Sequence, residues 1–296
     1  MDVYTTAGTN VGAIVGSGVG TISMTNCYAQ CDVESDYTAD NNGRVGGLVG
    51  RHMSDLMMTG CHYEGTVKGK YYVGGLIGYS EGKEAKINKC YAQGTILNCD
   101  DSQTTGRYHG GFIGASTGAN SKVSIENSWS TMSVYGEQFL GGMIGSFEGT
   151  QGLTVKNCYT DGCVKGRGIG GIVGRVTATA TITKCIVWDA TMTSTRTGGT
   201  QYASGPISGS AITSVNYSAC YRNPSMVYTD VTVPLVDHED VVNAKPAAPA
   251  VGIVDANQYA YHGKAAAAGS TISSVAKTLG WDETVWDLSK DVPVLK

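Results

Sequence analysis

The side chains in this chain best suited to acid–base chemistry are aspartates gathered in two connections. Asp32, Asp36 and Asp40 follow one cysteine-containing segment, and Asp100 and Asp101 follow another. Two carboxylates held about 5 to 9 Å apart can hydrolyse glycosidic bonds, and loop carboxylates can bind calcium. Acidic residues in turns more commonly serve solubility, and no D-x-[DN]-x-[DN]-G loop is present. A carbohydrate-active enzyme (a lyase or glycoside hydrolase) therefore stays an alternative to a non-catalytic protein.

Sequence motifs for other chemistry are missing. The chain has no H-E-x-x-H, no G-x-S-x-G and no P-loop. Its net charge is −4, and it has no run of Lys or Arg that would form the basic face of a nucleic-acid-binding protein. We therefore expect no catalytic residues, no metal, no cofactor and no nucleic-acid partner.

Six of the nine cysteines occupy one recurring position. Cysteines stacked in one column are expected to be buried free thiols that behave as small apolar side chains. Zinc is disfavoured, because there is no C-x-x-C and because Cys61 and His62 would lie on opposite faces of a strand. Pairing of Cys27 with Cys31, or of Cys158 with Cys163, stays open. The column consists of Cys27, Cys61, Cys90, Ser128 in the fourth copy, Cys158, Cys185 and Cys220.

The residue after each cysteine is usually aromatic. If the cysteines point inward, strand alternation directs these side chains outward into a stacked strip. Exposed aromatics with polar tips suit sugar rings or extended peptides, although stacking between neighbours for stability is the simpler interpretation. We call this strip the aromatic ribbon; its candidate ligand-binding residues are Tyr28, His62, Tyr91, Trp129, Tyr159 and Tyr221, with Ile186 between the last two.

The variable connections are a second candidate binding surface. They span residues 34–44, 98–109 and 193–203. Insertions on a repeat protein gather on one side and commonly carry binding. The candidate loop residues are Tyr37, Arg107, Tyr108, Arg196 and Tyr202.

The positions of these residues depend on a repeat of roughly 30 residues, the period of a solenoid. A V-G-G-L-V-G-like signature recurs six times, and the cysteine follows it at a nearly constant interval. Short alternating segments such as 123–125 and 181–183 between the two anchors predict strands. The Gly-Gly pairs suit sharp bends and close approach of one rung to the next. The copies are Val11–Gly16, Val45–Gly50, Val73–Gly78, His109–Gly114, Leu140–Gly145 and Ile169–Gly174, with a diverged seventh at Ser204–Gly209.

The signature, together with N-C-Y elements such as Asn26-Cys27-Tyr28 and Asn157-Cys158-Tyr159, resembles GLUG-motif repeats over residues 11–225. The resemblance implies a bacterial secreted or surface-anchored protein of adhesin-like type, and it supplies no shared catalytic residues. The closing segment with Gly280-Trp281-Asp282 and Val285-Trp286-Asp287 also resembles the end of such arrays. The expected fold is all-β: a β-helix of about seven rungs with three short strands per rung, plus a small C-terminal cap with one short helix.

We expect the repeat domain to span residues 1–235 and the cap residues 236–296. Apolar positions with helical spacing predict a helix over 270–279, ended by Gly280. A solenoid end exposes unpaired strands, which a cap must cover. The expected packing residues of the cap are Trp281, Trp286, Val292 and Leu295.

The apolar stretches fall well short of the roughly 18 residues needed to span a membrane. No signal-peptide pattern precedes the first copy, so we expect an export signal or anchor to lie upstream. The expected function is extracellular or cell-surface recognition of a glycan or matrix protein without catalysis. A structural stalk that displays another domain is the main alternative.

Overall fold

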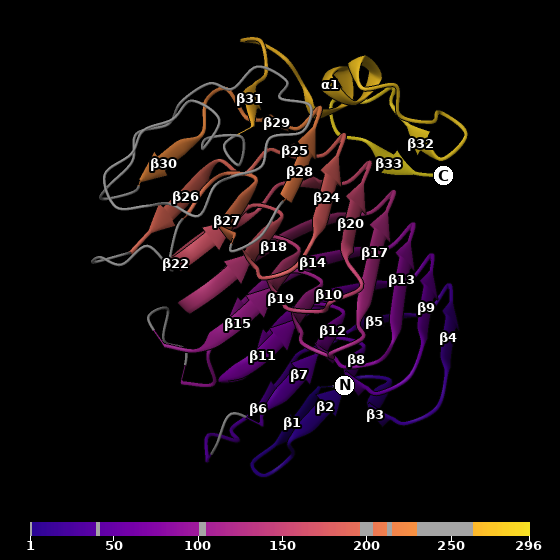
Figure 1. The fold of residues 1–296 in the computed structure, drawn as a ribbon, viewed down its shortest axis with the longest axis vertical. Helices are drawn as coiled ribbons and strands as arrows, with labels where there is room; N and C mark the ends of the chain where they lie inside the picture. Colours follow the sequence, from indigo (N-terminus) through magenta and orange to yellow (C-terminus); the bar gives the residue numbers. More distant parts are fainter. Residues whose placement is uncertain (1, 40–41, 101–104, 196–203, 212–214, 230–262) are drawn as a thin grey trace.

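The structure, a computed structural model, describes residues 2–39, 42–100, 105–195, 204–211, 215–229 and 263–296. The chain winds into a β-solenoid in which each turn, called a rung, contributes to three sheets (Figure 1). Every pairing between rungs is parallel, and the all-β expectation with about seven rungs is confirmed.

The second and third sheets hold seven strands each, one per rung. The second sheet follows the glycine signature and consists of β3 (Val15–Gly18), β8 (Val49–His52), β12 (Ile77–Ser80), β16 (Ile113–Ser116), β19 (Ile144–Phe147), β23 (Val173–Val176) and β27 (Ser208–Ala211). The third precedes the cysteines and consists of β4 (Ile22–Thr25), β9 (Leu56–Thr59), β13 (Glu84–Asn88), β17 (Lys122–Glu126), β20 (Leu153–Lys156), β24 (Ala180–Thr183) and β28 (Val215–Ser218).

The first sheet runs from the cysteines to the next glycine signature and has 17 strands, because most rungs cross it in two or three pieces. Its strands in rungs one to three are β1 (Val3–Thr5), β2 (Asn10–Gly12), β5 (Tyr28–Gln30), β6 (Val33–Ser35), β7 (Arg44–Gly46), β10 (His62–Lys68) and β11 (Tyr71–Gly74). The later ones are β14 (Tyr91–Leu97), β15 (Arg107–Gly110), β18 (Trp129–Gly141), β21 (Tyr159–Thr160), β22 (Cys163–Gly170), β25 (Ile186–Val187), β26 (Thr191–Ser194), β29 (Tyr221–Arg222), β30 (Val227–Thr229) and β31 (Lys264–Ala265).

The glycine signature places an apolar side chain in the core and brings adjacent rungs close together. Leu48, Leu76 and Phe112 occupy equivalent positions after the glycine pair, and each is fully buried. A Cβ added at Gly75 or Gly111 would lie well inside 3.0 Å of the backbone oxygen of the next rung, a distance that real Cβ atoms essentially never show. The glycine pairs are therefore required by contact between rungs.

The residue before each position of the cysteine column has a left-handed backbone. Asn26, Asn127 and Asn157 have φ values of 52°, 48° and 51°. Asparagine tolerates this conformation better than most residues because its short side chain bonds locally. Here the amides also link rungs, since Asn157 Nδ2 donates to Asn127 Oδ1 at 3.2 Å. This turn explains the Asn-Cys element of the repeat.

The cysteine column is buried as expected from Cys61 onward, and the cysteines are free thiols. Each thiol donates to the carbonyl two residues earlier, as Cys90 Sγ does to Asn88 O at 3.3 Å. Ser128 makes the same bond to Glu126 O at 2.7 Å, and its hydroxyl also accepts the Cys90 backbone N–H at 3.1 Å. Burial raises the pKa of the Cys185 thiol well above its ordinary value. The column therefore closes the left-handed turn with hydrogen bonds as well as filling space.

The hydrogen bonds of this column predict that Cys90→Ser is tolerated better than Cys90→Ala. Serine keeps an acceptor for the Cys61 N–H and a donor for Asn88 O, whereas alanine leaves the buried Cys61 N–H unpaired, at a cost of about 1–3 kcal/mol. Urea unfolding followed by circular dichroism measures both variants. Equal stability of the two variants, or a more stable alanine variant, would show that only packing matters at this position.

Near the C-terminus, helix α1 (Ile272–Thr278) lies inside the predicted range, and Gly280 ends it with φ of 66°. Thr271 caps α1 by accepting the Ser274 N–H at 3.2 Å. An antiparallel pair, β32 (Trp286–Asp287) and β33 (Val294–Leu295), follows.

Trp281 and Trp286 are buried and Leu295 is half-buried, as predicted. The prediction that Val292 packs inside is wrong, because Val292 lies in the connection before β33 and is 41% exposed, whereas the adjacent Pro293 is buried. The boundary at residue 236 lies outside the described residues.

Candidate ligand-binding surface

The aromatic ribbon is a continuous ring stack over the first five rungs. The strands that carry it pair in register, so that His62 lies opposite Tyr28 on one side and Tyr91 on the other. Their ring centroids are 4.9 Å and 4.4 Å apart, with planes within 11° of parallel. The stack continues from Tyr91 to Trp129 at 4.4 Å and from there to Tyr159 at 5.7 Å.

This stacking turns the ring faces toward one another, which limits how a ligand can use them. Each inner ring has a neighbour on both faces, so only ring edges and their polar tips point to solvent. The interpretation that neighbouring rungs stack for stability accounts for this geometry. A sugar cannot lie flat on the inner rings and would have to bind the edges by hydrogen bonds.

The C-terminal segment covers the later part of the ribbon. Tyr159 is 1% exposed, and its hydroxyl donates to Pro293 O at 3.1 Å. The rings of Trp281 and Trp286 lie 6.4 Å and 6.0 Å from the Tyr159 ring. Trp281 Nε1 donates to Lys184 O at 3.0 Å. Tyr159, Trp281 and Trp286 belong to one apolar cluster under the C-terminal segment. Trp129, Ile186 and Tyr221 also pack in this cluster, and they therefore do not form a free surface.

Three ribbon residues lie outside that cluster, and we call them the open ribbon: Tyr28, His62 and Tyr91. Tyr28 is 64% exposed, and the other two are half-buried. Two residues further along each strand, Gln30, Glu64 and Gln93 align in register. The Tyr91 hydroxyl donates to Glu64 Oε1 at 3.2 Å, and burial raises the Tyr91 pKa to about 12. The open ribbon thus lies beside a column of amide and carboxylate groups.

The structure does not bring the loop candidates that it describes, Tyr37, Arg107 and Tyr108, together with the ribbon. Arg107 and Tyr108 belong to strand β15, so their assignment to a loop is wrong. Arg107 Nε lies 3.5 Å from Glu137 Oε2, and Arg167 pairs with the same carboxylate. Tyr37 is half-buried, with its backbone N–H donating to Ser35 Oγ at 3.3 Å. Arg196 and Tyr202 lie outside the described residues.

A second ring stack was not predicted. Tyr72, Tyr108 and Phe139 stack with centroids 5.1 Å and 5.7 Å apart, and each has a left-handed backbone, with φ values of 51°, 62° and 58°. Bulky residues rarely adopt this conformation. The signal in the sequence was an aromatic residue directly before the glycine signature in three successive copies.

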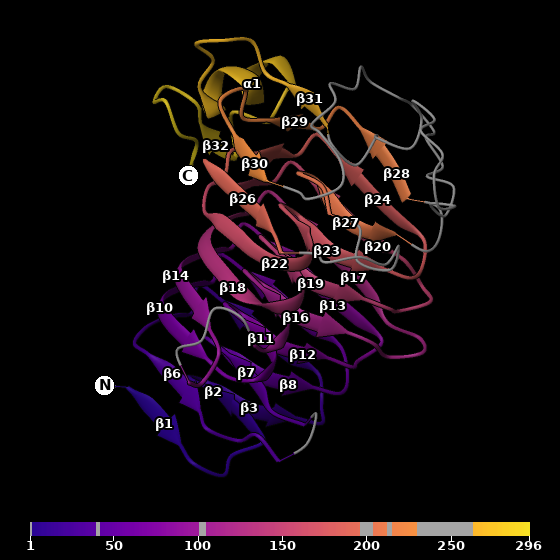
Figure 2. The ribbon, with the colours of Figure 1, turned by 90° about the vertical axis from the view of Figure 1, so that its left-hand side faces the viewer.

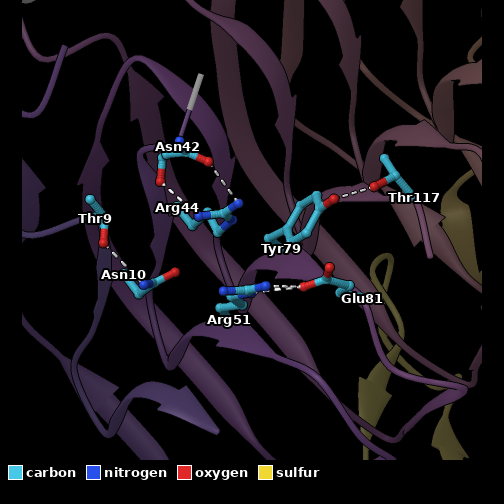
Figure 3. A network of polar contacts seen from close by, with 8 residues as sticks. All are labelled: Thr9, Asn10, Asn42, Arg44, Arg51, Tyr79, Glu81 and Thr117. Atoms are coloured by element: carbon cyan, nitrogen blue, oxygen red, sulfur yellow. Dashed lines mark hydrogen bonds and ion pairs between the residues drawn. The ribbon is translucent and has the colours of Figure 1, made fainter. Parts of the chain in front are cut away.

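Arginines flank this second stack, and two of them, Arg51 and Arg175, pair with neighbouring carboxylates. The Arg44 guanidinium lies 4.9 Å from the centre of the Tyr79 ring (Figure 3). Arg51 Nε donates to Glu81 Oε2 at 2.8 Å, and the Tyr79 hydroxyl bonds Thr117. At the other end, Arg175 lies 4.7 Å from the Phe139 ring centre and donates to Glu148 at 2.6 Å. Because Arg51 and Arg175 are paired within the protein and Arg44 is held by Asn42, we interpret this cluster as stabilising the corner between the first two sheets.

The described aspartates among those proposed for chemistry accept hydrogen bonds from neighbouring groups of the solenoid instead. Asp32 accepts the Thr66 N–H at 2.8 Å, Asp36 accepts the Tyr4 hydroxyl at 2.6 Å, and Asp100 accepts the Asn98 amide at 2.5 Å. Asp40 and Asp101 lie outside the described residues. Within the part of the chain that the structure describes, no group of three His, Cys, Asp or Glu side chains could hold a metal ion.

The sequence patterns gave no indication that His52, His109 and Asp189 are buried. His52 bonds Ser54 O and Ser80 Oγ, and burial lowers its pKa. His109 bonds Tyr135 O at 2.7 Å while its Nε2 has no partner, and burial lowers its pKa to about 4. Asp189 accepts the Gly162 N–H at 2.9 Å, and burial raises its pKa to about 7.

Comparison with known proteins adds one finding. Residues 69–97 match the family described as the GLUG motif, and this range spans the third glycine signature and Cys90. No curated protein and no solved structure matches the chain. No helix among the described residues is long and apolar enough to cross a membrane.

Proposed function

On the premise that this chain is a GLUG-repeat β-helix protein, we propose that it is a non-catalytic, adhesin-like recognition protein of the bacterial surface or the extracellular space. The fold itself fits a surface or structural β-solenoid. The finer proposal is that the open ribbon and its polar column bind an extended glycan, with a matrix protein as the alternative ligand.

One observation carries the proposal: two chemically different columns repeat side by side at the spacing of the rungs. Tyr28, His62 and Tyr91 offer ring edges with O–H and N–H groups, and Gln30, Glu64 and Gln93 offer amide and carboxylate groups. Adjacent strands lie about 4.8 Å apart, so the same set of donors and acceptors repeats along the solenoid axis. A polymer lying along this axis could hydrogen-bond several rungs at once, which raises its affinity above that of one sugar unit.

The competing proposal is a structural stalk, and a specific observation supports it. The ribbon rings stack on one another, and the C-terminal segment covers their later part. Both features stabilise the solenoid without any ligand. The two proposals differ in whether the exposed ribbon residues affect binding.

The distinguishing experiment measures binding of the protein to immobilised glycans and matrix proteins. We expect the double variant Tyr28→Ala/His62→Ala to lose binding by at least about tenfold, because hot-spot aromatics commonly contribute more than 1.4 kcal/mol each. Both side chains are partly exposed, so the variant should stay folded, whereas truncating Tyr159 would disturb the C-terminal segment.

Tyr4→Ala is the matched control. Tyr4 is 59% exposed and lies in the same sheet but outside the ribbon. Loss of binding in both variants, or in neither, would contradict a site on the ribbon. Absence of binding by the parent protein would favour the stalk.

A further inference from the structure

A buried polar pair lies at the corner between β14 and β15. Figure 2 shows β14 beside β18, the strand that pairs with it on one side. Asn98, directly after β14, is 2% exposed, and His109 of β15 is fully buried. In adjacent rungs the equivalent positions are apolar or small, since Val73 and Leu140 lie opposite His109 and Gly69 stands at the position of Asn98. Two polar side chains therefore replace the usual packing in one and the same rung.

The hydrogen bond of His109 fixes the position of its ring proton. Nδ1 lies 2.7 Å from Tyr135 O, which can only accept, so Nδ1 carries the proton. Burial lowers the pKa of His109 to about 4, and the carbonyl groups of Tyr135 and Lys70 offset this only in part, so the ring is neutral at pH 7. Nε2 is therefore an acceptor, and it has no partner among the described residues.

The side-chain amide of Asn98 is oriented by a neighbouring carboxylate. Its Nδ2 donates to Asp100 Oδ1, and an ionised carboxylate has no proton to offer to the amide oxygen, so the amide is not reversed. Asn98 Oδ1 is therefore a second buried acceptor, and it too has no partner among the described residues.

The two acceptors converge beside Gly106. A Cβ added at Gly106 would lie 2.9 Å from His109 Nε2 and 3.2 Å from Asn98 Oδ1. Glycine, with a left-handed φ of 89°, keeps a side chain out of this region. Two acceptors cannot bond each other, and a buried acceptor without a donor destabilises the folded state. A small group that donates two hydrogen bonds would satisfy both.

His52 shows how the chain meets the same need in another rung. Its Nδ1 lies 2.9 Å from Ser54 O, and its Nε2 lies 2.8 Å from Ser80 Oγ. The carbonyl again places the ring proton on Nδ1, so the Ser80 hydroxyl donates to Nε2. His109 has the same arrangement at Nδ1, but an amide oxygen stands near its Nε2 where His52 has a hydroxyl.

We propose that His109 Nε2 and Asn98 Oδ1 bind one ordered water molecule, which donates one hydrogen to each and fastens the end of β14 to the start of β15. Buried waters typically make about three hydrogen bonds to polar groups that would otherwise be unpaired. Water is favoured over a metal ion because both ligands are uncharged, and the Asp100 carboxylate contacts the amide hydrogens of Asn98 rather than its oxygen. A buried cation without a charged ligand is strongly disfavoured.

A crystal structure of the protein at high resolution tests the proposal directly. We expect density for one water molecule within about 3.2 Å of both acceptors. His52 is the matched control, because Ser80 already donates to its Nε2 and no water is needed there. Nitrogen-15 NMR of the histidine rings should find the proton on Nδ1 in both. A site without water, a metal ion identified by anomalous scattering, or a proton on Nε2 of His109 would overturn the proposal.

A double-mutant cycle tests the bridge in solution. His109→Leu and Asn98→Gly introduce the residue types that adjacent rungs carry at these positions, so the variants should fold, which circular dichroism checks. Each substitution removes one of the two acceptors and therefore the same bridge. Urea unfolding should give a double variant whose unfolding equilibrium constant is at least about tenfold smaller than the product of the two single effects. Effects that simply multiply would contradict a shared water.

Discussion

Gly111→Ala is expected to destabilise the solenoid by about 3 kcal/mol or more, measured by chemical unfolding. A Cβ at this position would lie well inside 3.0 Å of the Gly142 carbonyl oxygen and of Ser130 Oγ. The carbonyl belongs to the backbone of the next rung, where it cannot move without breaking the parallel pairing. If the added methyl group fitted without a clash, Gly111→Ala would instead stabilise the protein, because alanine in a strand is normally more stable than glycine by about 0.5–1 kcal/mol.

Gly20→Ala is the matched control for this prediction. A Cβ there would meet nothing within 4 Å, and the backbone does not adopt the left-handed conformation that favours glycine. Its effect should stay within about 0.5 kcal/mol. If Gly111→Ala were as mild as Gly20→Ala, close contact between rungs would not be the reason for the repeated glycine pairs.

Asp189→Asn is expected to raise the free energy of unfolding by about 2 to 4 kcal/mol at pH 7.5 and to change it little at pH 4. Asp189 is 1% exposed, and one carboxyl oxygen has no hydrogen-bond partner. The amide keeps an oxygen for the Gly162 N–H and carries no charge. Unfolding curves at a series of pH values give the difference directly.

The sign of this stability change follows from the shift in the pKa of the Asp189 carboxyl group. Burial raises the pKa of Asp189 in the folded protein to about 7 from an ordinary value of 3.8. Between these values the folded state holds a proton that the unfolded state has released, so stability falls as pH rises through the window. Above about pH 7 both states are ionised and the loss is complete.

The buried histidines act in the opposite direction. Burial lowers the pKa of His109 to about 4 from 6.5, so its contribution to stability is lost as pH falls through that range. The two effects partly cancel in the parent protein, and only the difference between variant and parent isolates Asp189. Asp55→Asn, at an exposed position, is the matched control for the substitution itself. An Asp189→Asn difference that does not vary with pH would contradict a buried, protonated carboxyl.

Local patterns in the sequence were enough to predict the rungs. The glycine signature and the buried cysteine column depend on contacts within one rung or between equivalent residues of adjacent rungs. The helix before Gly280 was predicted from the local spacing of its apolar residues. Register between parallel rungs follows from the period, so the stacking of Tyr28, His62 and Tyr91 could be expected as well. Val292 was misplaced because it lies in the connection before β33, where no strand or helix period fixes which side chains face the core.

The accessible surface could not be predicted in this way. Tyr159 is covered by Trp286 and Pro293, which are more than a hundred residues away in sequence, and no repeat pattern encodes that contact. The second ring stack also depends on a left-handed backbone at Tyr72, Tyr108 and Phe139, where an alternating strand would have been assumed.

The sequence by itself therefore determined the solenoid, its period and the residues that stack in columns, because each rung repeats the same local pattern and adjacent rungs pair in the same register. Only the tertiary structure decided which part of the ribbon stays open. This property arises under the C-terminal segment, where the contacts are non-local.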